Sequence, residues 1–282
     1  MTFAQDGFLS PSMESFRASL RKVATYDQWF QFAADLNTFS LELLWNHDVP
    51  AHDNQKVASC ALFVRAQHSF QAAVLLAKSG MLSDSRAVLR SAVEGAIALH
   101  GLESDNTFIE QLVEGHMVYQ RKIARLVLNN PDYKASHSAE QIRQMQETIA
   151  DVDAFEQGKH RNLREINWDQ VAAKHCKDLY NLLYRLLSSD GTHTNLNAIQ
   201  RFLSFEGEEL VGLKVGPDIT DLVDVLSMAC LMLMWAVGPF IRVFAKQGAE
   251  AKLQKYMRRF TELPHSEPPD ARVEGNFESF IC

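Results

Sequence analysis

Apolar residues recur at intervals of three and four along most of this chain, which is the spacing of helices that bury one face. The clearest example is the segment 26–46, where one side carries Trp29, Phe32, Leu36, Phe39 and Leu43. Similar periods in the rest of the chain predict about nine or ten helices with short connections. The pattern therefore indicates an all-α fold, with a single large helical bundle over residues 1–263.

Residues 60–100 are the part around which we expect the bundle to be organised, as two helices joined by a tight turn. Gly80 suits the left-handed conformation that ends many helices, and Ser83 or Asp84 can cap the next one. On that second helix Arg90 and Glu94 are four residues apart, so their side chains are neighbours and can pair. Packing is expected to bury both in part.

Three stretches depart from this pattern. Residues 205–217 alternate in polarity and contain Gly and Pro, which predicts a small irregular insert, either a short hairpin or a loop. Residues 132–166 are more polar and suggest a peripheral lobe. Residues 264–282 contain three prolines and little periodicity, so a loose C-terminal tail is expected after the bundle.

One segment, 225–241, has no charged residue in 17 positions, a helix of about 26 Å. This length is at the short limit for crossing a bilayer. Asp221 and Asp224 before the segment, Arg242 after it and Pro239 within it favour a buried core helix. A membrane anchor at 225–241 remains as the alternative, and the same helix is also a possible seam between two copies of the chain.

Charge and composition limit the classes of partner that the protein is expected to bind. The net charge of −7 gives no dominant footprint for nucleic acid, so no DNA partner is predicted, although the basic run 158–165 can contact RNA or another anion. The first residues, MTFAQDGFLSPSME, lack a basic start followed by an apolar run, which favours the cytoplasm. No CxxC spacing occurs, and Glu114 and His116 are two residues apart, which places them on different sides of a helix, so no metal and no cofactor are predicted.

A polar cluster is the candidate site. Arg90 and Glu94 on the second helix, with His193 from a later segment, would bring a cation, an anion and a neutral base together. These three are the candidate catalytic residues, and the candidate ligand-binding residues around them are Arg65, His68, Tyr184 and Ser188. Two interpretations stay open: a ligand or catalytic site, and a structural ion pair with a capping histidine.

The residues of this cluster also carry a resemblance. The helix Leu89–Arg90–Ser91 with Glu94, followed by Tyr184, Leu187–Ser188 and His193, resembles a group of bacterial helical proteins classed as a domain of unknown function. The resemblance covers about residues 55–205, the core motif region. It implies an all-helical fold without an established activity.

A more distant resemblance is to HEPN-type helical bundles, many of which are toxin or defence ribonucleases with an Arg, four to six residues and then a His. Arg185 and His193 are separated by seven residues, so this sequence departs from that motif. The resemblance implies a metal-independent ribonuclease in which His193 acts as acid and base and Arg90 or Arg185 holds the phosphate.

These observations lead to three functional hypotheses. The first is an interaction or ligand-sensing module with a buried Arg/Glu/His cluster, with a homo-oligomer expected and a protein or RNA partner possible. The second is the metal-independent ribonuclease, of toxin or phage-defence type. The third is a membrane-associated protein anchored by 225–241.

Overall fold

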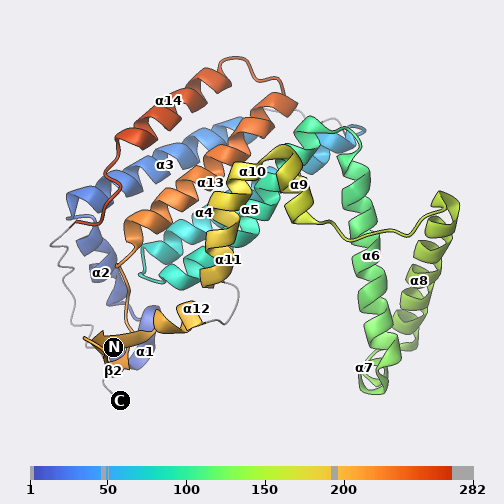
Figure 1. Ribbon diagram of the computed structural model, residues 1–282, viewed down its shortest axis with the longest axis horizontal. Coiled ribbons are helices and arrows are strands. Elements are labelled where there is room, and N and C mark those ends of the chain that lie inside the picture. The colour runs from blue at the N-terminus through green and yellow to red at the C-terminus, as the bar shows by residue number, and fades with distance from the viewer. Residues whose placement is uncertain (1–2, 46–48, 50, 192–195, 269–282) are drawn as a thin grey trace.

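Three long helices pack against one another at the centre of the fold: α4 (Asn54–Ala77), α5 (Leu82–Ser104) and α13 (Leu222–Val243). In this computed structural model, which describes residues 3–45, 49, 51–191 and 196–268, α3 (Ala24–Trp45) packs on α4 and α13, and α14 (Ala249–Glu262) packs on α13 (Figure 1). The prediction of an all-α bundle is confirmed.

The remaining elements surround this centre or extend from it. Their bounds are α1 (Phe3–Asp6), η1 (Gly7–Leu9), α2 (Met13–Leu20), α6 (Phe108–Asn129), α7 (Pro131–Ala135), α8 (Ala139–Lys159), α9 (Trp168–His175), α10 (Lys177–Leu179), η2 (Tyr180–Tyr184), α11 (Arg185–Gly191), α12 (Leu196–Gln200), β1 (Leu203–Glu206) and β2 (Glu209–Leu213). Within the described residues, nine helices have eight or more residues. This agrees with the number expected from the periodicity.

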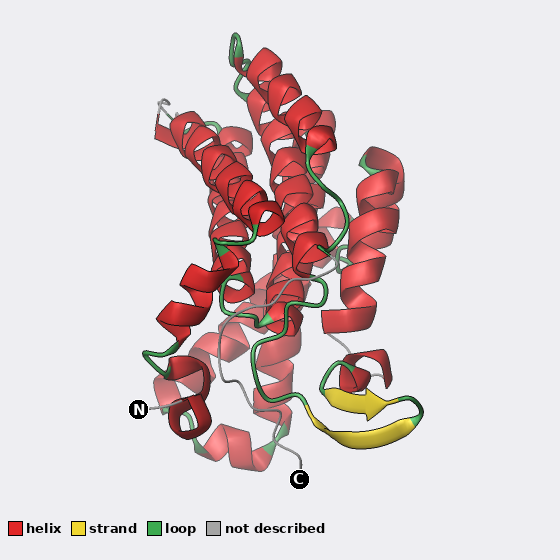
Figure 2. Ribbon diagram, turned by 90° about the vertical axis from the view of Figure 1, so that its left-hand side faces the viewer, coloured by secondary structure: helices red, strands yellow, loops and turns green. Residues whose placement is uncertain are grey.

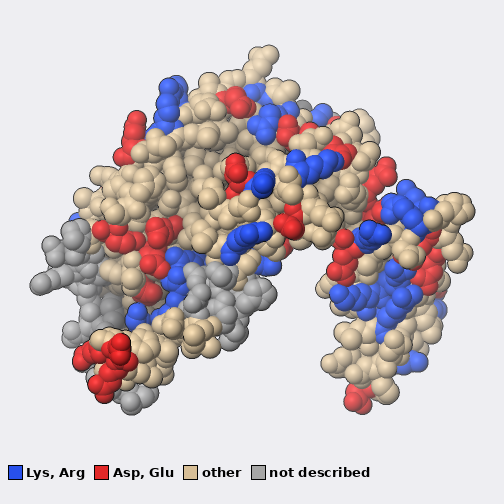
Figure 3. Space-filling model, in the orientation of Figure 1, with Lys and Arg blue, Asp and Glu red and all other residues tan. Residues whose placement is uncertain are grey.

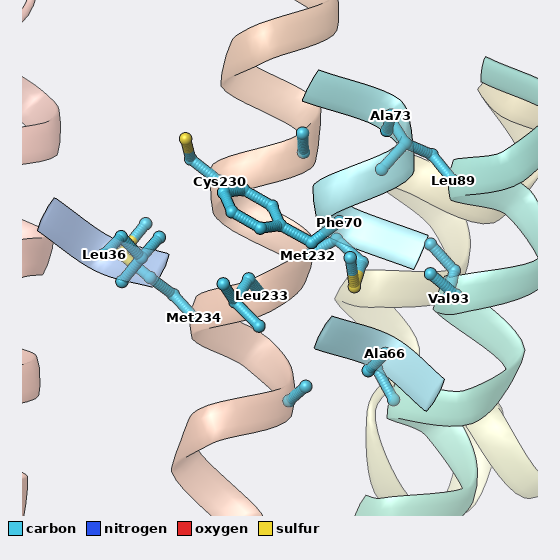
Figure 4. Close-up of a cluster of buried hydrophobic side chains, with 14 of the residues drawn as sticks. Leu36, Ala66, Phe70, Ala73, Leu89, Val93, Cys230, Met232, Leu233 and Met234 are labelled. Carbon is cyan, nitrogen blue, oxygen red and sulfur yellow. The ribbon is translucent and has the colours of Figure 1, made fainter. Parts of the chain in front are cut away.

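Small residues on α4 allow the central helices to approach closely. Ala66 and Ala73 are fully buried, and Phe70 between them on the same helix reaches toward Cys230 of α13, while Leu89 and Val93 enter from α5 (Figure 4). Alternating small and large side chains in this way fills the interior without voids. The hydrophobic face of α5 is thus buried in the core, and the polar edge of α5 lies at the border of that core.

Helix α13 is the one described helix that is long and apolar enough to cross a membrane by length and composition, and 72% of its most apolar window is buried inside the bundle. The helices α3, α4, α5 and α14 all pack against it. Its apolar surface is therefore covered largely by protein, as the sequence prediction of a core helix requires.

Helices α6, α7 and α8 form an arm that projects from the bundle (Figure 1). The two long helices of the arm pack side by side, and Arg121 of α6 joins them through Asp153 at 2.8 Å and Glu156 at 2.5 Å. Ser138 begins α8 with a capping box to Gln141. The lobe expected at 132–166 thus includes α6 as well.

The irregular insert is a two-stranded hairpin at the edge of the molecule (Figure 2). Strands β1 and β2 are antiparallel, with Leu203 opposite Leu213 and Glu206 opposite Glu209, and the register shifts between Ser204 and Phe205. A left-handed glycine, Gly207, lies in the turn. The prediction for residues 205–217 is confirmed, although the first strand begins two residues earlier.

The segment 167–188, which the sequence predicts as one helix, is interrupted. Cys176 has φ −160° and ψ 53°, so α9 ends there and a second helical stretch begins with α10. Within that stretch η2 is a π-helix, in which the N–H of Arg185 donates to the carbonyl oxygen of Tyr180. The interruption and the wider turn change the direction in which the side chains of the following residues point.

The start of the predicted tail is held against the bundle. Trp29 Nε1 donates to the Pro264 carbonyl oxygen at 2.8 Å, and Glu267 accepts hydrogen bonds from the Tyr26 hydroxyl and from the Val223 amide. A loose tail therefore does not describe residues 264–268. Residues 269–282 lie outside the described part of the chain, where the expectation stays a prediction.

Gly80 offers a test of the turn between α4 and α5. Its φ is +73°, and a Cβ added there would lie 2.5 Å from Pro217 Cβ and 2.9 Å from the Asp218 nitrogen. We expect Gly80→Ala to lower the free energy of unfolding by about 2–4 kcal/mol, because the conformation is strained and the backbone must move. Urea denaturation measures this loss. Gly158→Ala is the matched control, since no atom lies within 4 Å of its added Cβ; equal losses in the two variants would contradict the prediction.

Candidate functional site

The structure brings four of the predicted site residues together around Arg90. The Arg90 guanidinium donates from Nε to Ser188 Oγ at 3.2 Å and from Nη2 to the Tyr184 hydroxyl at 2.8 Å. Its Nη1 lies 3.4 Å from Glu94 Oε1. The Tyr184 hydroxyl in turn donates to Glu94 Oε1 at 3.2 Å. We call these residues, Arg90, Glu94, Tyr184 and Ser188, the Arg90 cluster.

The π-helix η2 places Tyr184 of this cluster beside a second tyrosine, Tyr180. The rings of Tyr180 and Tyr184 stack with centroids 4.8 Å apart and an angle of 17° between their planes. The Arg90 guanidinium carbon is 5.0 Å from the centre of the Tyr184 ring, and that of Arg185 is 5.6 Å from the Tyr180 ring. Both contacts have cation–π geometry. The Tyr184 side chain therefore holds Arg90 through its ring and its hydroxyl at once.

Burial raises the pKa of the Tyr184 phenol above its ordinary value, and the nearby Glu94 carboxylate contributes to the rise, while Arg90 opposes it. The hydroxyl thus stays protonated and keeps donating to Glu94. Arg90 and Glu94 remain 23% and 24% exposed at their side chains, so the cluster lies at the edge of the core. The ion pair and hydrogen bonds of the Arg90 cluster join α5 to η2 and α11.

This arrangement limits the chemistry at Arg90. Each of its three guanidinium nitrogens already faces a protein oxygen, and its charge is matched by Glu94. A phosphate or carboxylate ligand would have to displace at least one of these oxygens. Of the two interpretations left open by the sequence, the geometry is therefore better suited to the structural ion pair than to a site that binds phosphate.

The other predicted site residues are placed apart from the Arg90 cluster. Arg65 on α4 is exposed and donates to Ser91 Oγ at 2.9 Å, on the residue after Arg90. His68 is exposed one turn further along α4, and no hydrogen bond among the described residues joins it to the cluster. His193 lies outside the described residues, so its proximity to Arg90 stays a prediction.

A model of a family of unknown function, DUF5677, matches residues 56–210. The chain belongs to the DUF5677 family. This confirms the resemblance to a domain of unknown function. No curated protein and no solved structure matches the chain. The matched region contains α4 from residue 56 on, α5, the arm and the whole Arg90 cluster, whereas α13 lies beyond it.

A second charged cluster in this DUF5677 protein was missed from the sequence. Arg86, one turn before Arg90, is 5% exposed at its side chain and lies with both terminal nitrogens 3.3 Å from Asp221 Oδ2. Arg201 reaches the same oxygen at 2.7 Å. Burial alone would raise the pKa of Asp221, but the two arginines outweigh it and leave the pKa below its ordinary value. The regular spacing of Arg86, Arg90 and Glu94 was the available signal, but it did not identify Asp221 as the partner.

Where the arm meets the bundle, a polar crevice of about 880 Å³ lies between α6, the 161–167 loop and α9. Glu114 at its wall is buried and accepts from Arg161 Nη2 at 2.6 and 2.7 Å. Lys159 of the same run pairs with Glu110 at 3.8 Å. Two cations of the basic run 158–165 are thus matched by acidic partners, which weakens its use as an anion-binding patch.

An apolar groove of about 220 Å³ lies between α13 and α14, with His100 of α5 at one side. The His100 ring centroid is 5.5 Å from that of Trp235, and burial lowers the pKa of the imidazole to about 4, so the side chain is neutral at pH 7. Within the described residues, no group of three or more His, Cys, Asp or Glu is placed to hold a metal ion.

The Arg90 cluster predicts strong coupling. Because Arg90 and Glu94 share Tyr184, we expect Arg90→Ala and Glu94→Ala each to lower the free energy of unfolding by about 1–3 kcal/mol, and the double variant to lose about 1 kcal/mol less than the sum. Urea denaturation of the four proteins measures the coupling. The exposed pair Lys122 and Glu165 gives a control cycle with coupling near zero. Additive losses at Arg90 and Glu94 would rule out the structural role.

Asp221 predicts an acid-dependent stability. Its pKa is lower in the folded than in the unfolded protein, so its contribution is fully present above the unfolded value of about 4 and is lost as the pH falls through the lower folded value. We expect Asp221→Asn to cost about 3 kcal/mol at pH 7, since it leaves the buried Arg86 charge without its carboxylate. Urea denaturation between pH 7 and 3 should show that the difference in the free energy of unfolding between wild type and Asp221→Asn becomes smaller as the pH falls. A difference that stays constant with pH would contradict this.

Proposed function

We propose that this protein is an interaction module that presents the α6–α8 arm to a helical protein partner. The observation that carries the proposal is a row of large apolar side chains on the outer surface of α6: Tyr119, Ile123 and Leu126 are 57%, 40% and 56% exposed. Their spacing of four and three places them on one face of the helix. Rows of this kind are the anchors by which amphipathic helices bind partners.

The geometry of the arm explains why this row stays uncovered within one chain. Arg121 and Arg125 of α6 form ion pairs with Asp153 of α8, so α8 occupies their side of the helix. Ile123 lies two residues beyond Arg121, about 200° around the helix axis. In a hairpin of two helices, each helix covers only the side of the other that faces it. The opposite side of α6 can therefore be buried only by a further helix.

The alternatives have less support. A ribonuclease with Arg90 holding the scissile phosphate would require that residue to give up a contact that it makes with Glu94, Tyr184 or Ser188. A membrane anchor at 225–241 would require α13 to leave the four helices that pack on it. The Arg90 cluster instead ties η2 and α11 to the bundle. We expect a protein rather than RNA or DNA as the partner and the cytoplasm as the location.

Site-specific photo-crosslinking tests the proposal. A benzophenone side chain at position 123, in cells that express the full chain at its natural level, is expected to give a discrete adduct on a denaturing gel after irradiation. Position 146 on α8 is the matched control, because Gln146 is an exposed residue of the same arm on the other long helix. No adduct at 123, or equal adducts at both positions, would overturn the interaction module.

A further inference from the structure

The apolar row on α6 extends inward as a seven-residue repeat. Starting from the bundle, the steps between successive members are three, four, three, four and three. The members are Ile109, Leu112, His116, Tyr119, Ile123 and Leu126. This alternation keeps one narrow stripe in line and is the pattern of a coiled-coil seam rather than of the broader face that packs into a core. We call this stripe the α6 seam.

The bundle and α8 leave most of the α6 seam open. Ile109 and Leu112 are partly buried against the core at the base of the arm, whereas the next members, from His116 to Leu126, are exposed. The helix has 22 residues, which is about 33 Å or three heptads. Figure 1 shows this length held away from the bundle, so another helix can lie along it.

Charge is segregated from the α6 seam. Every charged residue of α6 has an ion-pair partner on α8 or on the segment that follows it: Glu110 with Lys159, Glu114 with Arg161, Arg121 with Asp153 and Glu156, Lys122 with Glu165, and Arg125 with Asp153. Acidic and basic side chains accordingly lie side by side on the arm in Figure 3. The α6 seam itself contains no Asp, Glu, Lys or Arg.

We propose that the partner of the arm is a second copy of this chain, whose α6 lies along the α6 seam of the first. An uncharged seam is self-complementary, since two identical stripes meet without repulsion between like charges. The positions that flank it on one side, Val113, Gln120 and Val127, are also uncharged. Lys122, which flanks it on the other side, is paired with Glu165 within its own chain.

One polar residue of the repeat fits this assignment, since His116 lies within the α6 seam. A few polar side chains at such positions lower the stability of a coiled coil but restrict its register and its number of strands. With each α6 already carrying α8, two arms would form a four-helix bundle, which buries the row on both chains.

This proposal rests on the interaction module proposed above, and it replaces the 225–241 helix as the expected seam. Helix α13 is largely enclosed by four helices of its own chain, so its apolar surface is not available to a second copy. On α6 the apolar residues are exposed. Pairing through the arm therefore needs no rearrangement of the bundle.

Sedimentation velocity of the full chain tests this inference. Wild type at 1–100 µM is expected to show a species of twice the 31.9 kDa monomer mass. Ile123→Glu with Leu126→Glu should weaken the dimer at least 100-fold, because four carboxylates would meet in one apolar seam. Tyr119→Glu, one turn away, should act in the same direction, and circular dichroism confirms that each variant keeps its helix content.

The matched control is Gln146→Glu with Ala150→Glu, which adds the same charge to exposed positions of α8 and should leave the dimer intact. Wild type that stays monomeric at 100 µM, or a dimer that survives all the α6 variants, would overturn the second copy as partner. The crosslink at position 123 separates the two proposals. An adduct whose mass differs from two chains supports the interaction module and excludes self-pairing, whereas no adduct removes both.

Discussion

The close packing of α4, α5 and α13 is the constraint on which the rest of the structure depends. Helix α13 is too apolar to face water, and the alanines of α4 and the apolar face of α5 provide the surface that covers it. Once these three helices are together, α3 and α14 cover the remaining apolar surface of α13. The orientation of α5 in this core also decides where its polar edge points, because the two faces belong to one rigid helix.

The polar edge of α5 joins the core to the two segments that come later in the chain. Arg86 meets Asp221 at the start of α13, and Arg90 meets Glu94 together with Tyr184 and Ser188. Both arginines lie near apolar residues, where a guanidinium without a counter-charge would be costly. Asp221 reaches Arg86 only when α13 is correctly docked, and the hydroxyls of Tyr184 and Ser188 reach Arg90 only when η2 and α11 are. The charged edge thus makes one arrangement of these helices more favourable than the others.

The arm follows a different physical logic from the bundle. In the bundle, apolar faces are buried and the charged residues at their edges close on each other. On α6 the charged residues pair with α8 and with the segment that follows it, while a stripe of uncharged, mostly apolar residues faces solvent. Exposed apolar stripes of this kind are uncommon on proteins that act alone. The uncovered side of α6 is the observation from which we propose that this protein works by association.

By itself the sequence determined the all-α class, the turn at Gly80, the presence of an irregular insert near 205–217 and the pairing of Arg90 with Glu94, because each depends on residues close together in the chain. The seven-residue repeat of α6 was also present there, but periodicity alone does not tell a core face from an open seam. Tertiary structure decided that Asp221 is the partner of Arg86, that a π-helix brings Tyr184 to Arg90, and that α8 covers only the charged side of α6. These contacts join residues 32 to 135 positions apart, and only the packing of whole helices brings such residues together.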